Sequence, residues 1–228
     1  MSTYFITAID TDAGKTIVTG LLGKYLKDQK ADVITMKLSQ TGCEEVSEDI
    51  EKHRELMGED LRPEDLSGET CPYLFNFPAS PHLAAEMEGR IIDPKRLIQS
   101  IRSIESKYQE VLVEGVGGLM VPINHDVLVA DFVQEHDFPV ILVTSGRLGS
   151  INHTLLTLEV LKNRGITVHG MIYNHYPVTA PEITADSGLV LKKHLKNYFP
   201  EALWGEVPFV DEHSLDGIDM KLEGWFSE

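Results

Sequence analysis

The fold of this chain is decided by the stretch Ile9-Asp10-Thr11-Asp12-Ala13-Gly14-Lys15-Thr16. The residues ahead of it, from Tyr4 to Ile9, are mostly apolar and predict a short buried strand. Behind it, apolar residues recur at helical spacing over residues 17–26. The Gly-Lys-Thr triplet therefore lies where a strand turns into a helix, which is where a phosphate-binding loop has to lie.

The chemistry of such a loop explains its residue types. The first N–H groups of a helix have no partner within the helix, and its dipole is positive at that end. Gly14 lets the backbone approach a phosphate, Lys15 supplies a positive charge, and Thr16 offers a hydroxyl to Mg²⁺. The usual pattern has a first glycine where this chain has Ile9, so the alternative is a chance Gly-Lys-Thr at a helix start.

Length and charge narrow the classes of protein that fit. We expect one α/β domain over residues 1–228, because 228 residues can bury a sizeable core. The net charge of −16 (20 basic against 36 acidic residues) argues against nucleic-acid or anionic-membrane partners. Without an apolar span or a signal peptide, we expect a cytoplasmic protein. Cys43 and Cys71 form neither a disulfide scaffold nor a CxxC metal site.

Apolar runs alternate with helical patterns along the rest of the chain. Predicted strands cover residues 4–9, 32–37, 110–114, 138–143, 168–173 and 203–209. Predicted helices cover residues 17–26, 47–58, a segment from His82 onward, 94–108, 151–161 and 181–199, while residues 38–42 form a polar turn and residues 59–81 a long irregular loop. This alternation predicts a P-loop NTPase-like fold with a mostly parallel central sheet and helices on both faces.

In such sheets, ligands bind beyond the carboxyl ends of the strands. The polar and glycine-rich segments all follow a predicted strand: residues 10–16, 37–42, 114–118, 144–150 and Asn174. We therefore expect these segments to meet at one edge of the sheet and to form a single site.

Lys37 and Glu114 in this set, and Asp49 outside it, each have more than one interpretation. Lys37 either extends to solvent or adds a second ammonium group beside Lys15 at the γ-phosphate. Glu114 ends a buried strand, where an unpaired carboxylate would be costly, so we expect a magnesium ligand rather than a surface charge. Asp49 is the candidate for a second carboxylate ligand, and its neighbours Glu48 and Glu51 compete with it.

Other chemistries have little support. The run Gly115-Val116-Gly117-Gly118 suits a close approach of backbone to a ligand, but its spacing is not that of a dinucleotide-binding loop. No His-Glu-x-x-His motif occurs, and Ser145 lacks the flanking glycines of a nucleophile elbow. The 9 histidines are scattered, and a lone one such as His169 reads as a structural residue.

Together these motifs resemble the dethiobiotin synthetases, enzymes of biotin synthesis. The matching segments, in family order, are residues 10–16, Lys37 with Thr41-Gly42, Pro78-Ala79-Ser80-Pro81-His82, residues 113–118, residues 148–153, Asn174 and residues 205–208. The resemblance implies that ATP drives the carboxylation and ring closure of 7,8-diaminononanoate (7,8-diaminopelargonate). One amine takes up CO₂ to form a carbamate, the carbamate attacks the γ-phosphate, and the second amine closes a cyclic urea on the resulting carbamic–phosphoric anhydride.

The same resemblance implies roles for individual residues, with ATP and CO₂ as co-substrates and Mg²⁺ as cofactor. The implied catalytic residues are Lys37, Lys15 and Thr11, and the implied metal ligands are Thr16, Asp49 and Glu114. The implied nucleotide-binding residues are Asp12, Ala13, Gly14, Lys15, Thr16, Ile17, Asp49, Glu114, Gly115, Val116, Gly117, Asn174, Val207, Pro208 and Phe209. The implied substrate-binding residues are Lys37, Thr41, Ser80, Gly149, Ser150, Ile151 and Asn152, the last four acting across a homodimer interface.

Departures from the family pattern leave the nucleotide preference open. The family usually has glycine in place of Ala8, proline in place of Leu38 and alanine in place of Val116. Two other P-loop classes compete with this reading. A ligase that amidates carboxylates needs an ammonia source, usually a glutaminase domain, for which we expect no room. A partitioning ATPase has an extra lysine early in its phosphate loop, which Asp10 to Ala13 do not supply.

Overall fold

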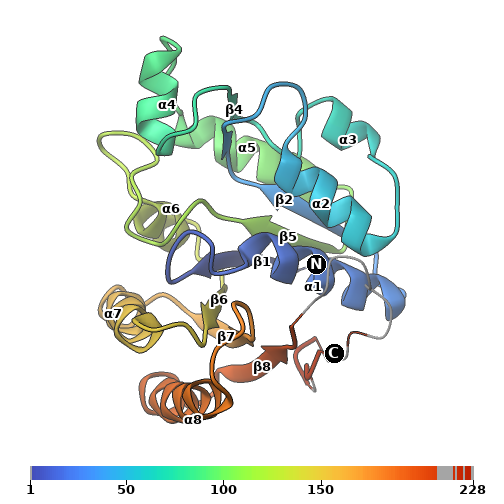
Figure 1. Cartoon of the computed structure of the whole chain (residues 1–228). Coiled ribbons are helices and arrows are strands. Elements are labelled where there is room, and N and C mark those ends of the chain that lie inside the picture. Colours follow the sequence, from blue (N-terminus) through green and yellow to red (C-terminus); the bar gives the residue numbers. More distant parts are fainter. Residues whose placement is uncertain (1, 210–217, 219, 223, 227–228) are drawn as a thin grey trace.

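A six-stranded parallel sheet forms the centre of the computed structural model, which describes residues 2–209, 218, 220–222 and 224–226 (Figure 1). Its strands are β1 (Ser2–Ala8), β2 (Val33–Lys37), β5 (Glu110–Glu114), β6 (Val140–Ser145), β7 (Val168–Asn174) and β8 (Leu203–Val207). Their spatial order is β2-β5-β1-β6-β7-β8, and every neighbouring pair is parallel. The expected parallel sheet is confirmed.

Helices cover both faces of this sheet, as expected. They are α1 (Lys15–Asp28), α2 (Glu48–Met57), α3 (Pro63–Leu66), α4 (Pro81–Met87), α5 (Pro94–Glu105), α6 (Val129–Glu135), α7 (Ser150–Asn163) and α8 (Pro181–Tyr198). Helices α1 and α2 pack together on one face, and α5, α6, α7 and α8 lie on the other (Figure 1). Right-handed crossovers account for the face taken by α1 and by α5 to α8, whereas α2 belongs to the β2–β5 connection and lies on the α1 face by packing on α1.

The strands are buried because they are apolar on both sides. Val111, Leu112 and Val113 of β5 are fully buried, and all six residues of β6 are buried. A strand covered on both faces loses its solvent contacts entirely, so continuous rather than alternating apolar runs specify it. Because these strands are parallel, the polar residues that end them lie at a common edge of the sheet.

The predicted boundaries agree with the structure to within a few residues. Ser47 caps α2 by accepting a hydrogen bond from the Ile50 amide at 3.3 Å, and Gly58 ends the helix with a φ of 64°. The strand predicted over residues 203–209 ends earlier, at Val207, and the helix predicted over residues 94–108 ends at Glu105.

Four short elements were not predicted. The turn and the irregular loop contain α3 and a second, two-stranded parallel sheet of β3 (Gln40–Thr41) and β4 (Leu74–Phe75). Local patterns cannot reveal this sheet, because its strands have two residues each and pair across a long separation. No element was predicted at α6 either, since its seven residues are too few to establish a helical period and its N-cap is Leu128.

Near the C-terminal end, Leu222 and Trp225 pack on β7 and β8, and Phe226 lies beside Tyr25 of α1. The Trp225 ring is 2% exposed and fills slots left by two glycines. A Cβ at Gly170 would lie 2.6 Å from this ring, and one at Gly205 would lie 3.0 Å from it. Among the described residues, no helix has both the length and the apolar character needed to cross a membrane.

Candidate functional site

The predicted phosphate loop connects β1 to α1, as its sequence indicated. Gly14 is the residue before α1 and has a left-handed φ of 92°, which an L side chain rarely adopts. A Cβ at this position would lie 2.1 Å from the Asn174 side-chain nitrogen. The first turn of α1 has no side-chain cap, so its N–H groups are available to an anion. Gly14 is therefore required both by conformation and by space.

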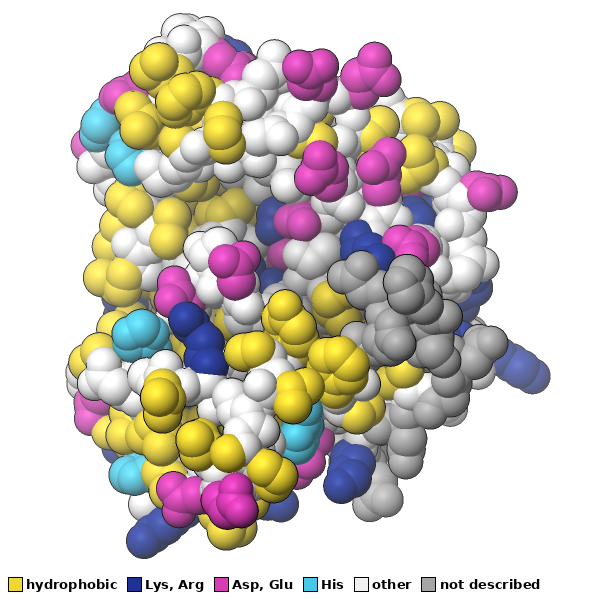
Figure 2. Space-filling view, viewed as in Figure 1, with side chains coloured by type: hydrophobic (Ala, Val, Ile, Leu, Met, Phe, Trp, Pro, Cys, Tyr) yellow, Lys and Arg dark blue, Asp and Glu magenta, His cyan; other side chains and the backbone are white. Residues whose placement is uncertain are grey.

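A cavity of about 1050 Å³ opens beside this loop. The predicted site residues that line it are Thr11, Asp12, Gly14, Lys15, Thr16, Ile17, Lys37, Thr41, Asp49, Ser80, Glu114, Val116, Gly117, Asn174 and Phe209. In Figure 2 the face is hollowed near its middle, where basic and acidic side chains lie next to each other. Loops from far apart in the chain thus meet at the carboxyl edge of the sheet.

Lys37 does not extend to solvent. Its side chain is 7% exposed, and its Nζ lies 2.5 Å from Asp49 Oδ2 and 2.7 Å from Glu114 Oε1. Burial alone would lower the pKa of Lys37, but the Glu114 and Asp49 carboxylates outweigh it and raise the pKa above its usual value. Lys37 is therefore a fixed positive charge inside the cavity.

Lys15 is a second ammonium group in the same cavity. It is 7% exposed, and its Nζ donates to the Asp10 carbonyl at 3.3 Å. Burial lowers the pKa of Lys15 to about 8, and the positive charge of Lys37 adds to that lowering. Two positive charges buried in one cavity favour the binding of an anion between or beside them.

Three oxygens, one each from Thr16, Asp49 and Glu114, lie close together in the same cavity. Thr16 Oγ1 lies 3.0 Å from Asp49 Oδ1 and 3.1 Å from Glu114 Oε1. A hydroxyl has one proton to donate, so Thr16 Oγ1 can donate to only one of these carboxylates, while Lys37 Nζ already contacts both, at Asp49 Oδ2 and Glu114 Oε1. This donor set fits Mg²⁺, which takes few carboxylates and completes its shell with waters and phosphate oxygens.

The geometry also separates Asp49 from its competitors. Glu48 and Glu51 are exposed, whereas Asp49 contacts both Thr16 and Lys37. No group of three or more His, Cys, Asp or Glu side chains is placed to hold a metal within the described ranges, so this site would depend on two carboxylates and a hydroxyl.

Sequence reasoning missed one member of this cluster, His53. Its Nε2 lies 2.7 Å from Glu114 Oε2, and both side chains are fully buried. Burial would raise the pKa of Glu114, but Lys37 and the hydrogen bond from His53 hold it well below its usual range. The signal that could have found His53 is its spacing of four residues from Asp49, which places both on one face of α2.

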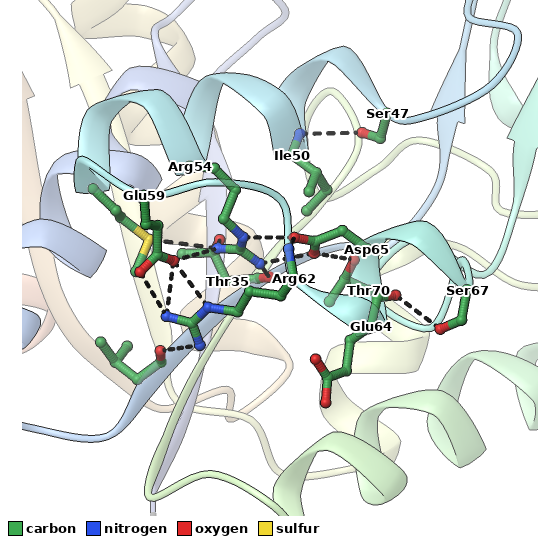
Figure 3. A network of polar contacts seen from close by, with 12 residues as sticks. Thr35, Ser47, Ile50, Arg54, Glu59, Arg62, Glu64, Asp65, Ser67 and Thr70 are labelled. Atoms are coloured by element: carbon green, nitrogen blue, oxygen red, sulfur yellow. Dashed lines mark hydrogen bonds and ion pairs between the residues drawn. The ribbon is translucent and has the colours of Figure 1, made fainter.

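The next residue, Arg54, fixes α2 against the sheet (Figure 3). Its guanidinium makes a bidentate contact with Asp65 of α3, at 2.7 Å from Nε and 2.9 Å from Nη2. Nη1 also donates to Thr35 Oγ1 of β2 at 2.8 Å. Burial would raise the pKa of Asp65, but its hydrogen bonds from Arg54 lower it below the usual value. Helix α2 therefore presents Asp49 and His53 from a rigid base.

Some predicted residues lie outside the cavity lining: Ala13, Gly115, Gly149, Ser150, Ile151, Asn152, Val207 and Pro208. Gly149 precedes α7 with a φ of 90°, and Ser150 Oγ contacts Ser145 Oγ at 3.1 Å. A Cβ at Gly115 would lie 2.7 Å from the Phe5 ring, so this glycine serves close packing on β1. Gly117, by contrast, lines the cavity, so its close approach to a ligand stays a prediction.

Of the residues predicted to bind the adenine base, Asn174 and Phe209 line the cavity, whereas Val207 and Pro208 do not. The Asn174 amide nitrogen donates to the Ala13 carbonyl at 3.1 Å, and its oxygen accepts from the Tyr176 amide at 3.1 Å. Asn174 thus connects β7 to the phosphate loop, and its role in reading a base stays a prediction. Phe209 stacks on Tyr176, which sequence reasoning had not named, with ring centroids 6.2 Å apart.

Comparisons with known proteins agree with this geometry. A family described as an AAA domain matches residues 2–214. A relative from Pasteurella multocida (strain Pm70) named ATP-dependent dethiobiotin synthetase BioD 2 is 49% identical over 201 residues, which cover 88% of this chain and 94% of the relative. The Chlorobaculum tepidum ATP-dependent dethiobiotin synthetase BioD is 50% identical over 206 residues, covering 90% and 84% of the two chains. A protein of the same name from Anoxybacillus flavithermus is 33% identical over 231 residues, covering 99% and 100%.

Solved structures resemble the fold at lower identity. The ParA family ATPase from Chlorobium tepidum has a TM-score of 0.54 and 18% identity, covering 94% of this chain and 87% of its own. The Pyrococcus furiosus cell division ATPase MinD has a TM-score of 0.54 and 17% identity, covering 91% and 84%. These likenesses show that the sheet and its helices form a P-loop ATPase fold.

Proposed function

From the premise that this chain belongs to the ATP-dependent dethiobiotin synthetase family, we propose that it closes the ureido ring of dethiobiotin on 7,8-diaminononanoate, CO₂ and ATP. It is an ATP-dependent ligase of biotin synthesis. The observation that carries the proposed chemistry is the meeting of Lys15 and Lys37 with Thr16, Asp49 and Glu114 in one cavity at the phosphate loop.

The proposed reaction has three steps. One amine adds to CO₂ and loses a proton, giving a carbamate. A carbamate oxygen attacks the γ-phosphorus of ATP, and ADP leaves as a carbamic–phosphoric anhydride forms. The second amine attacks the carbamate carbon, phosphate leaves, and loss of a proton gives the five-membered urea.

Fixed positive charge is what this chemistry needs, because a carbamate and a triphosphate repel each other. Lys15 and Lys37 are both buried at the cavity wall, so they can hold the two anions without first being desolvated. Thr11 and Thr41 also line the cavity, and we assign their hydroxyls to carbamate or phosphoryl oxygens. Ser80, across the cavity, is assigned to the diamine.

Thr16, Asp49 and Glu114 would hold Mg²⁺, as the convergence of their oxygens supports. When bound there, Mg²⁺ would offset the negative charge of the β- and γ-phosphates. The residues Asp12 to Ile17 would bind the triphosphate through backbone N–H groups, with Val116 and Gly117 beside it. Asn174, Val207, Pro208 and Phe209 would form the base-binding end.

A homodimer completes the proposal. Residues Gly149, Ser150, Ile151 and Asn152 stand at the start of α7 and outside the cavity lining, and we assign them to a diamine carboxylate bound in a partner subunit. Gly149 and Asn152 are exposed, whereas Ser150 is buried and contacts Ser145. We also propose that the enzyme works in the cytoplasm as a single domain.

The test is a product assay. Purified protein with the diamine, bicarbonate and MgATP should form dethiobiotin, ADP and phosphate, measured by mass spectrometry and a phosphate assay. Omitting the diamine should abolish ADP release. ATP turnover that ignores the diamine and responds to DNA or lipid would replace the proposal with a nucleotide switch.

A further inference from the structure

We propose that His53 is a positioning residue that determines which oxygen of Glu114 faces the cation site. This inference rests on the proposed function to the extent that Glu114 is taken as a magnesium ligand. His53 belongs to no motif of the sequence, and its role follows from its contacts alone.

The two oxygens of Glu114 have different partners. Oε1 lies 2.7 Å from Lys37 Nζ and 3.1 Å from Thr16 Oγ1, on the cavity side. Oε2 lies 2.7 Å from His53 Nε2. An ionised carboxylate can only accept hydrogen bonds, so His53 donates through Nε2. The carboxylate is therefore held at both oxygens, with Oε1 directed to Thr16.

The second ring nitrogen shows that this contact, rather than general packing, accounts for a histidine here. His53 Nδ1 is buried and has no hydrogen-bond partner among the described residues. Burying an unpartnered polar atom is costly, and an apolar side chain would avoid that cost. The single hydrogen bond to Glu114 is the interaction that offsets it.

Removing the donor would free the carboxylate to turn. Oε2 would then be fully buried without a partner, while Lys37 lies 2.7 Å from the other oxygen. The carboxylate can recover a second interaction by rotating so that Lys37 contacts both oxygens. That rotation withdraws Oε1 from Thr16 and breaks up the three-oxygen set. By donating to Oε2, His53 keeps the Glu114 carboxylate from rotating toward Lys37.

His53 is itself held in place. It lies one turn after Asp49 on α2, and the neighbouring Arg54 anchors the helix to Asp65 and Thr35. The helix therefore fixes one cation ligand directly, through Asp49, and a second indirectly, through His53. Partners that orient metal-binding carboxylates typically change metal affinity by about 10–100-fold when removed.

The experiment measures ADP binding by calorimetry, in excess Mg²⁺ and in EDTA, for the wild type and for His53→Leu, His53→Gln and His53→Asn. The quantity compared is the ratio of the Kd in EDTA to the Kd in Mg²⁺. A glutamine amide reaches the place of Nε2, whereas an asparagine amide is one methylene too short. His169→Leu is the matched control, because His169 packs among Tyr4, Trp225 and Phe226 instead.

We expect His53→Leu and His53→Asn to lower this ratio by about tenfold or more, with His53→Gln and His169→Leu close to the wild type. The proposal is overturned if His53→Leu and His53→Asn keep the Kd ratio of the wild type. It is also overturned if His53→Gln and His53→Asn lose equally, or if the wild-type protein itself has a ratio of one, so that Mg²⁺ does not affect its ADP binding. If His53→Leu does not fold, the comparison of Gln with Asn decides. Wild-type protein that binds MgADP but makes no dethiobiotin would remove the proposed function alone.

Discussion

Lys37 and Glu114 are register partners at the last positions of the neighbouring parallel strands β2 and β5, and their side chains form an ion pair of 2.7 Å. Strand pairing alone therefore brings a cation and an anion together at the carboxyl edge of the sheet. Because Glu114 is fully buried, neither charge can be removed without affecting the other.

Lys37→Ala should lower both the rate and the stability. We expect dethiobiotin formation to fall by about 10²–10³-fold, because a fixed charge beside the transferred phosphoryl group is lost. The free energy of unfolding should fall by about 3–5 kcal/mol, because the buried Glu114 carboxylate loses its ion-pair partner and keeps only its contacts with His53 and Thr16. Steady-state kinetics and urea unfolding measure the two effects.

The double variant Lys37→Ala/Glu114→Gln separates these effects. Stability should return most of the way to that of the wild type, since the buried charge is gone, while activity stays low. Lys24→Ala, which removes an exposed lysine paired with Asp28, should change neither quantity. Wild-type turnover in Lys37→Ala would contradict the assigned role of Lys37.

Asp49→Asn should reduce Mg²⁺-dependent turnover by about 100-fold or more, because a neutral amide is a poor magnesium ligand. Glu48→Gln and Glu51→Gln remove neighbouring charges that are exposed, and they should retain wild-type activity. Titration of activity with Mg²⁺ for the three variants makes the comparison. If Glu48→Gln or Glu51→Gln loses as much as Asp49→Asn, the ligand assignment is wrong.

Gly14→Ala should weaken nucleotide binding strongly, because its Cβ would lie 2.1 Å from the Asn174 amide nitrogen and would displace it from the Ala13 carbonyl of the phosphate loop. Gly89→Ala is the matched control: its φ of 64° is also left-handed, but nothing lies within 4 Å of the added Cβ. That control should lose only about 1–2 kcal/mol of stability through backbone strain. Calorimetric titration with ATP and thermal unfolding report the two outcomes, and wild-type ATP affinity in Gly14→Ala would refute the crowding argument.

Acid should weaken the Arg54–Asp65 anchor. The folded-state pKa of Asp65 lies below its unfolded value of about 3.9, so its stabilisation is present above that pH and is lost as pH falls through the folded pKa. Urea unfolding between pH 7 and pH 3 should show a smaller pH-dependent loss in Asp65→Asn than in the wild type. At pH 7 this variant should be about 3–5 kcal/mol less stable, because Arg54 is left buried without its partner. Parallel pH curves would exclude Asp65 as a contributor.

The features predictable from sequence were those encoded locally. Strand–turn–helix order, continuous apolar strands and the polar residues that end them predicted the parallel sheet, the phosphate loop and the meeting of Lys15, Lys37 and Glu114. His53 was not singled out among the 9 histidines, because only its four-residue spacing from Asp49 marks it in the sequence and its importance comes from a contact with a residue 61 positions away. The Arg54–Asp65 pair and the β3–β4 sheet likewise depend on where the long loop folds back.

The nearness of Lys15 to Lys37 also bears on how a turnover ends. In the proposed reaction, the inorganic phosphate released by ring closure would be attracted by the same two ammonium groups that are proposed to bind the triphosphate. Phosphate release therefore has to overcome the same electrostatic attraction to Lys15 and Lys37 that favours binding of the triphosphate. Phosphate and other compact anions in a buffer should accordingly compete with ATP, and slow product release is a natural limit on the speed of such a cavity.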